Sequence, residues 1–157
     1  MSDLYQTSAD LKATTQDLAR VESPSACLSL TRSATLAITT AGTTITWQTE
    51  LRSQGITWSG TDITIPTAGY YVLNLSYTAT AHTAFMRLIV NGTTTGFFSS
   101  SALSSSTQAF TVVRYFATGD VVRLQALPSV NVTIAVNAEG TTGESPILHI
   151  AQLTGVP

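Results

Sequence analysis

The sequence predicts an all-β fold, an antiparallel sandwich preceded by a short N-terminal helix or arm. Threonine and serine make up 45 of the 157 residues, and threonine is β-branched, which suits pleated strands and is poor material for long helices. From Thr35 onward, apolar and polar residues alternate with a period of two, as in strands that are buried on one face. Glycine-containing turn signals separate these runs, so we expect strands to dominate after residue 25.

The first residues follow a different pattern, with a leucine at every seventh position. Leu4, Leu11 and Leu18 have this spacing and predict a helix over residues 3–20. Three leucines make a weak seam, and a single short helix is marginally stable. Two interpretations therefore stay open, an arm that docks on a partner and a three-stranded bundle.

We divide the chain into an N-terminal arm or helix, residues 1–30, and a head domain, residues 31–157. The polar stretch 99–106 is predicted to be a loop. Candidate strands in the head cover residues 34–40, 44–51, 61–65, 70–80, 84–91, 107–117, 120–127, 130–138 and 146–153.

Two of these strands differ in how their apolar residues are distributed. In the first, one face is predicted to be core and carries Tyr71, Leu73, Leu75 and Tyr77. In the second, both faces are apolar, with Phe110, Val112 and Phe116 on one and Ala109, Val113 and Tyr115 on the other. A strand that is apolar on both faces needs cover from outside its own sandwich. The second strand therefore predicts contact with another subunit.

Four segments resemble, in the same order, the tumour necrosis factor-like and complement C1q-like jelly rolls. The stretch from Ile63 to Leu73 is similar to the entry to the central strand of those domains. Arg87 to Gly92 resembles their next strand and turn, Phe110 to Leu124 resembles a strand, glycine-aspartate turn and strand, and Ile147 to Leu153 resembles their last strand. The resemblance covers roughly residues 34–154 and implies a jelly roll in which three subunits assemble.

In that family, the edge of one subunit packs on the inner sheet of its neighbour. By position, the resemblance implies a trimer interface made by Val72, Asn74, Ser76, Ala109, Thr111, Val113 and Ile147. The chain lacks the large aromatic residues that soluble cytokines carry at several of these positions.

Composition and motifs exclude several kinds of function. The net charge is −2, so no basic field attracts nucleic acid. Cys27 is the single cysteine, His82 and His149 have no spaced acidic partner, and no serine lies in a Gly-x-Ser-x-Gly elbow. We therefore expect no enzyme activity, no catalytic or metal site and no cofactor. We also expect no membrane span, and folding in a cytoplasm, since no signal peptide is recognised.

A trimeric head with little charge and an N-terminal arm is typical of virion parts. The sequence predicts a bacteriophage capsid decoration protein, of the cement or head-fibre type, assembled in the host cytoplasm. The arm, with Leu4, Leu11 and Leu18, is predicted to attach it to the major capsid protein or another virion protein. The alternative is the receptor-binding tip of a tail fibre, in which loops 93–106 and 138–145 recognise a host-surface glycan.

Overall fold

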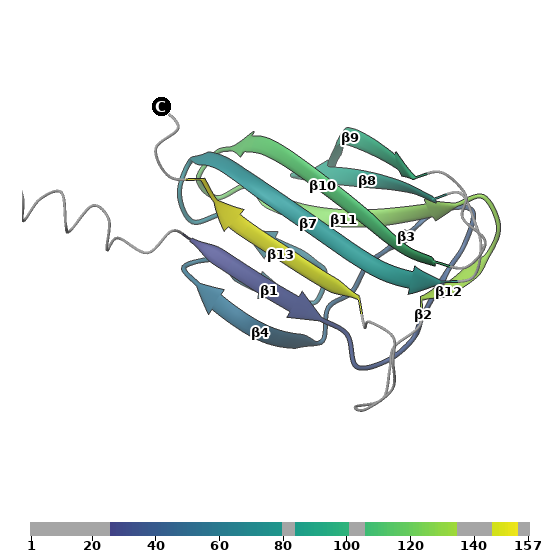
Figure 1. Cartoon of the computed structure of the whole chain (residues 1–157). Coiled ribbons are helices and arrows are strands. Elements are labelled where there is room, and N and C mark those ends of the chain that lie inside the picture. Colours follow the sequence, from purple (N-terminus) through teal and green to yellow (C-terminus); the bar gives the residue numbers. More distant parts are fainter. Residues whose placement is uncertain (1–25, 80–83, 101–105, 135–145, 154–157) are drawn as a thin grey trace, which may run out of the picture.

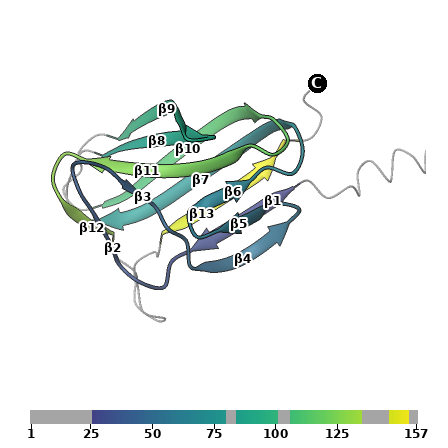
Figure 2. The same ribbon diagram turned by 180° about the vertical axis from the view of Figure 1, so that it is seen from behind.

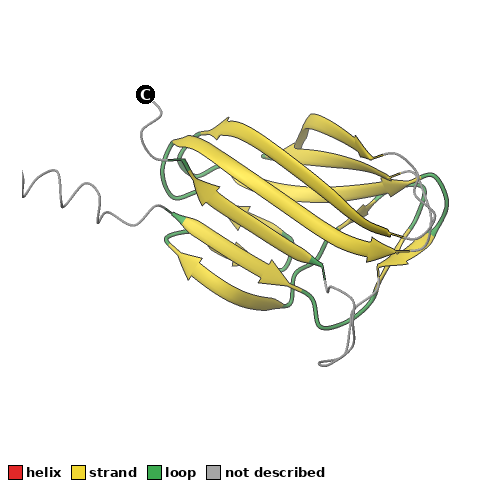
Figure 3. Ribbon diagram, viewed as in Figure 1, coloured by secondary structure: helices red, strands yellow, loops and turns green. Residues whose placement is uncertain are grey.

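The computed structural model describes residues 26–79, 84–100, 106–134 and 146–153. Every regular element in this part is a strand, which confirms the predicted all-β class (Figure 3). The predicted helix 3–20, with Leu4, Leu11 and Leu18, lies outside the described residues. The strands are β1 (Cys27–Thr31), β2 (Leu36–Ile38), β3 (Thr43–Thr44), β4 (Thr49–Gln54), β5 (Thr57–Ser59), β6 (Asp62–Thr64), β7 (Gly69–Ala79), β8 (Ala84–Val90), β9 (Thr93–Ser100), β10 (Ser106–Phe116), β11 (Val121–Pro128), β12 (Val132–Ile134) and β13 (Ile147–Gln152).

Two antiparallel sheets lie face to face and form the sandwich (Figures 1 and 2). One sheet has the order β10-β7-β13-β1-β4. The other has the order β5-β6-β11-β8-β9, with β3 paired to β11, and β2 and β12 form a separate pair. Neighbours in each sheet are mostly distant in sequence, so the chain crosses repeatedly between sheets. The predicted antiparallel sandwich is confirmed.

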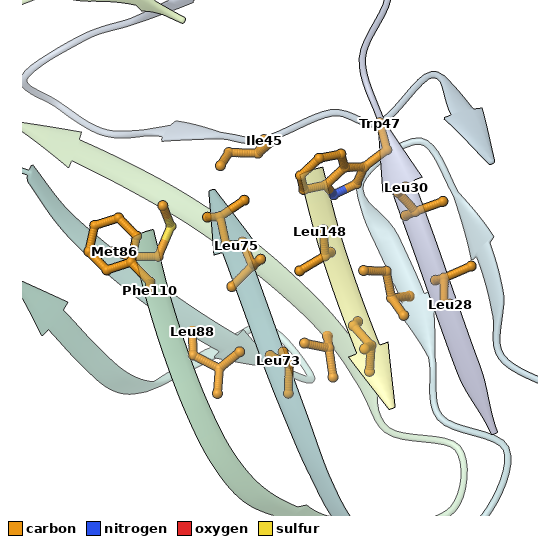
Figure 4. Packing of buried hydrophobic residues seen from close by; sticks show 14 of the residues in the cluster. Leu28, Leu30, Ile45, Trp47, Leu73, Leu75, Met86, Leu88, Phe110 and Leu148 are labelled. Atoms are coloured by element: carbon orange, nitrogen blue, oxygen red, sulfur yellow. The ribbon is translucent and has the colours of Figure 1, made fainter. Parts of the chain in front are cut away.

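The core lies between the two sheets and contains the predicted face of β7. Tyr71, Leu73, Leu75 and Tyr77 are each at most 3% exposed. Met86, Leu88, Val122 and Leu124 face them from the opposite sheet, and Figure 4 shows part of this cluster. Such side chains contribute stability through the apolar area that they remove from water. The assignment of the two faces of β7 from the sequence is therefore correct.

The segment predicted as one strand, residues 44–51, is divided between the two sheets. Its beginning, β3, pairs with β11, whereas its end belongs to β4, which pairs with β1. Between them, Ile45 and Trp47 are buried, and their backbone N–H groups bond to Leu124 O and Gly60 O at 2.8 and 2.9 Å. Buried and exposed residues keep alternating where the chain passes from one sheet to the other, because the core lies between the two sheets. The sequence pattern therefore does not show that the segment changes sheets.

Three strands lie where the sequence predicted none: β1, β9 and the short β5, which pairs with β6. The predicted arm 1–30 included most of β1, which in fact lies between β13 and β4 in the five-stranded sheet. The head therefore begins before residue 31, since Leu28 and Leu30 of β1 are fully buried. Likewise, most of the predicted loop 93–106 is strand β9, which pairs with β8 at the edge of the second sheet. An edge strand needs only one partner and tolerates a polar sequence. It can therefore lack the apolar alternation by which strands are recognised in a sequence.

The glycine-aspartate turn at Gly119 connects two strands, as the resemblance implied. These strands, β10 and β11, belong to different sheets, so the turn does not close a hairpin. Gly119 has φ +84°, a conformation that glycine adopts without steric cost. Its N–H bonds to Ile65 O at 2.8 Å, and Asp120 Oδ2 accepts the Ala117 N–H at 2.8 Å. The turn thus carries the chain across the end of the sandwich.

Side chains connect the two sheets along both open edges. On one edge, Arg114 Nη1 of β10 donates to Thr95 O of β9 at 2.7 Å. On the other, Trp58 Nε1 of β5 donates to Glu50 Oε2 of β4 at 2.7 Å. These contacts fix the two sheets relative to each other, so the remaining face of each sheet is a surface of defined shape.

Candidate assembly surface

Figure 1 looks onto the five-stranded sheet, whose side chains alternate between the core and the outside. We call the outward set on β10, β7, β13 and β1 the front face. Its described members are Ala109, Thr111, Val113 and Tyr115 on β10, Tyr70, Val72, Asn74, Ser76 and Thr78 on β7, Ile147, His149 and Ala151 on β13, and Cys27, Ser29 and Thr31 on β1. None of these residues is Asp, Glu, Lys or Arg.

The front face brings together all seven residues that the sequence assigned to a trimer interface. Across β10 and β7, Val113 lies opposite Val72, Thr111 opposite Asn74, and Ala109 opposite Ser76. Ile147 of β13 lies on the other side of Ser76. Directly opposite side chains in antiparallel strands are about 5 Å apart at their Cβ atoms. The seven residues therefore form one continuous patch, and their role in assembly stays a prediction.

Large apolar side chains are exposed at one end of this patch. Val113 is 56% exposed, Tyr115 54% and Tyr70 38%. The two tyrosines pack edge to face, with ring centroids 5.5 Å apart. Beside the two tyrosines, a row of small and apolar side chains runs across four strands: Val113, Val72, Ala151 and Cys27. Contiguous apolar surface of this kind marks sites of interaction in soluble proteins.

A polar row crosses the middle of the front face. Thr111 Oγ1 donates to Asn74 Oδ1 at 2.7 Å, and Asn74 lies opposite His149. His149 Nδ1 is hydrogen-bonded to Ser29 Oγ at 2.8 Å, and Ser29 lies opposite Arg52 on the edge strand β4. The sequence pattern places none of His149, Ser29 and Arg52 in a site. Only the register between distant strands places them together.

The outward face of the second sheet is different, because it carries charged residues, among them an ion pair. Arg123 contacts both carboxylate oxygens of Asp62, with Nη2 to Oδ2 at 2.7 Å. Hydrogen bonding from Arg123 lowers the pKa of Asp62 to about 2. Arg87 Nη1 on the same face donates to Gln125 Oε1 at 3.3 Å. Paired, hydrated charges suit a surface that stays in water, so the two outward faces of the sandwich have opposite character.

The proximity of Ser29 and His149 does not make a catalytic site. Both side chains lie on a sheet surface, and β1 is paired on both sides, so its backbone N–H groups are used in the ladders. A nucleophile also needs donors that stabilise a developing oxyanion. Within the described ranges no three His, Cys, Asp or Glu side chains form a metal-binding group, and no helix is long and apolar enough to cross a membrane.

The residues predicted for other contacts have different outcomes. The proposed docking leucines, Leu4, Leu11 and Leu18, lie outside the described residues. So does the predicted glycan-binding loop 138–145. The other predicted glycan loop, 93–106, is mostly strand β9, which leaves little of it as a recognition loop.

The structure is similar to several solved structures. Murine APRIL at pH 5.0 matches with a TM-score of 0.60 and 14% identity, covering 82% of this chain and 99% of that one. Eiger TNF from S. frugiperda matches with a TM-score of 0.58 and 10% identity, covering 85% and 96%. The globular domain of the zebrafish complement 1qA protein matches with a TM-score of 0.58 and 13% identity, covering 82% and 97%. No protein-family model and no curated protein matches the sequence.

These likenesses show that the head has the jelly-roll fold of TNF-type ligands and C1q globular domains. The resemblance predicted from four short segments of sequence is thus confirmed at the level of the fold. Identities this low establish the fold alone, and a fold hosts many functions.

Proposed function

We propose that the protein is a structural homotrimer whose copies pack through the front face. The observation that carries this proposal is the front face, which spans four strands without a single Asp, Glu, Lys or Arg and exposes Val113, Tyr115 and Tyr70. Arg52 lies at its border, on the edge strand β4. Interface centres are depleted in charged residues and enriched in aromatic ones. The second sheet keeps its charges on its outward face, so it is the side that stays in water.

The number of three copies comes from the family resemblance. In TNF-like and C1q-like jelly rolls, one subunit's edge packs on its neighbour's inner sheet, which closes into a threefold ring. A contact between two different surfaces of the same chain must either close in this way or continue as a filament. The fold likeness supports the closed arrangement.

We further propose that the trimer decorates a bacteriophage capsid, attached to a capsid protein by residues 1–25. The chain enters the head at Cys27, which lies opposite Ala151, at the end of the front face where β7 starts and β10 ends. Cyclic symmetry places the three entry points at the same height along the axis. All three arms then leave from one end, an arrangement that suits attachment to a single surface.

Sedimentation equilibrium of the full chain at micromolar concentration tests the trimer. We expect the mass of three chains, and we expect Val113→Asp to give a folded monomer, because the charge is tolerated at an exposed site but not within an apolar contact. Val130→Asp is the matched control, since Val130 is 52% exposed and lies between β11 and β12, away from the front face. A monomeric wild type, or a trimeric Val113→Asp variant, would overturn the proposal.

A further inference from the structure

We propose that His149 makes assembly through the front face depend on pH, so that copies associate near neutral pH and separate in mild acid. This inference rests on the proposed function, because it requires the front face to be covered by a neighbouring subunit. It concerns a residue that the sequence pattern did not place in the interface.

His149 occupies a central position on that face. It lies on β13, the third of five strands, and is flanked by Asn74 of β7 and Ser29 of β1. Its side chain is exposed in the single chain. The row of residues that contains His149 lies between the row with Val113 and Val72 and the row with Ile147. A subunit that covers both outer rows therefore also covers His149.

The groups that face His149 offer no negative charge. From β7 come the amide of Asn74 and, behind it, the hydroxyl of Thr111; from β1 come the hydroxyl of Ser29 and the thiol of Cys27. The charged group on this side of the described sheet is Arg52 of β4, opposite Ser29, and it is positive. The remaining titratable groups, the phenols of Tyr70 and Tyr115, lie at the end of the face.

Protonation of His149 therefore has different consequences in the separated and the associated states. In a separated subunit, water solvates the imidazolium. Under a neighbouring subunit, the same charge loses its hydration, finds no carboxylate on its own front face and stays on the same side of the sheet as the positive Arg52, so the charged form is disfavoured. Histidine is the side chain that changes charge between about pH 5 and 8.

The direction of the effect follows from proton linkage. The associated state binds fewer protons at His149 than the separated state, so association weakens as the pH falls. Each histidine that must lose a proton on association lowers the association constant by up to about tenfold for each unit that the pH falls. A trimer has three such histidines, so one pH unit changes its association constant by up to about a thousandfold. Carboxyl groups with an ordinary pKa titrate near pH 4, and the pKa of Asp62 is about 2. These groups therefore stay charged over the pH range in which histidine titrates.

Sedimentation velocity of the full chain at about pH 8 and about pH 5.5 tests the inference, with circular dichroism to check folding. We expect the wild type to be assembled at the higher pH and to lose at least about tenfold in association at the lower one. His149→Gln, which stays neutral and keeps hydrogen-bonding capacity, should be equally assembled at both. His149→Lys, with a permanent charge, should be separated at both. His82→Gln should behave as the wild type.

The outcomes separate this inference from the proposed function. A wild type that stays assembled to the same extent at both pH values overturns the role of His149 and leaves the trimer intact. A wild type that is monomeric at about pH 8 overturns both. If His149→Gln still dissociates in acid, or His149→Lys assembles normally, another group is responsible and the assignment to His149 is wrong.

Discussion

Tyr115 packs edge to face against Tyr70, with ring centroids 5.5 Å apart, and both rings remain exposed on the surface of the five-stranded sheet. Two other aromatic pairs in the described strands, Tyr71 with Phe116 and Tyr77 with Phe110, lie in the core. An aromatic pair on an uncharged surface is the type of side-chain group that dominates binding at interfaces.

Tyr115→Ala should therefore weaken self-association by about 2 kcal/mol or more. The dissociation constant from sedimentation equilibrium measures the change. Leu51→Ala is the control, because Leu51 is 57% exposed but belongs to the edge strand β4, outside the front face. Equal effects of the two substitutions would show that the tyrosine pair is not an anchor.

Two consecutive tyrosines on β7 test the assignment of its faces. Tyr71 is fully buried, its hydroxyl donates to Thr67 O at 2.8 Å, and burial raises its pKa, whereas Tyr70 is 38% exposed. Tyr71→Ala should cost about 3–5 kcal/mol, as for other large buried aromatic residues. Tyr70→Ala should cost much less. Urea unfolding in the monomeric Val113→Asp background measures stability without assembly, and similar losses for both would mean that the faces are inverted.

The sequence predicted the strands that are long enough to show by themselves which residues share a face. β7 and β10 are 11 residues long each, so the period of two was enough to assign the residues of both faces before any partner was known. β1 was missed because it has only five residues, most of which lie in the stretch that was assigned to the N-terminal arm. β9 was missed because its sequence starts with three threonines and a glycine.

The candidate surface was predictable only in part, for a related reason. That Val72, Asn74 and Ser76 share one face follows from the period of one strand, and the same holds for Ala109, Thr111 and Val113. Their place in an interface was implied by the family resemblance. The bond between His149 and Ser29 joins residues 120 positions apart, and it depends on the register of β1 against β13. Register is set by the packing of the whole sheet, so a pattern within one segment does not contain it.

Arg32 tests how the chain is held between β1 and β2. It is 4% exposed, and its guanidinium bonds to the backbone and hydroxyl oxygens of Thr46, to Ala34 O at 3.2 Å and to Thr35 O at 3.4 Å. Burial lowers its pKa. Arg32→Met removes these charge-assisted hydrogen bonds and should cost about 1–3 kcal/mol in urea unfolding.

Arg52→Met is the control for Arg32→Met, since Arg52 is exposed on β4. A change within about 0.5 kcal/mol is usual at such positions. A loss for Arg52→Met as large as that for Arg32→Met would contradict a specific role of the buried guanidinium.

The ion pair of Asp62 and Arg123 predicts a pH dependence. The pKa of Asp62 is lowered to about 2 by the hydrogen bond from Arg123, so the pair stabilises the fold above the ordinary carboxyl pKa of about 3.9. This contribution is lost as the pH falls from about 4 towards 2. Arg123→Gln should raise the Asp62 pKa towards the ordinary value, as measured by NMR titration. An unchanged midpoint would show that the guanidinium is not the cause.

The start of β1 allows attachment and folding to be tested separately by truncation. Deleting residues 1–24 leaves Cys27–Thr31 in place between β13 and β4, so the truncated chain should fold and self-associate. Under the decoration hypothesis, it should no longer bind capsid shells, and particles without it should be less resistant to heat.

Deleting residues 1–31 also removes Leu28 and Leu30 from the core and leaves β13 and β4 without their shared partner, so this chain should not fold. Circular dichroism and co-sedimentation with shells measure the two properties. If the shorter deletion still bound shells as tightly as the full chain, the attachment would lie on the head, and the arm would have another role.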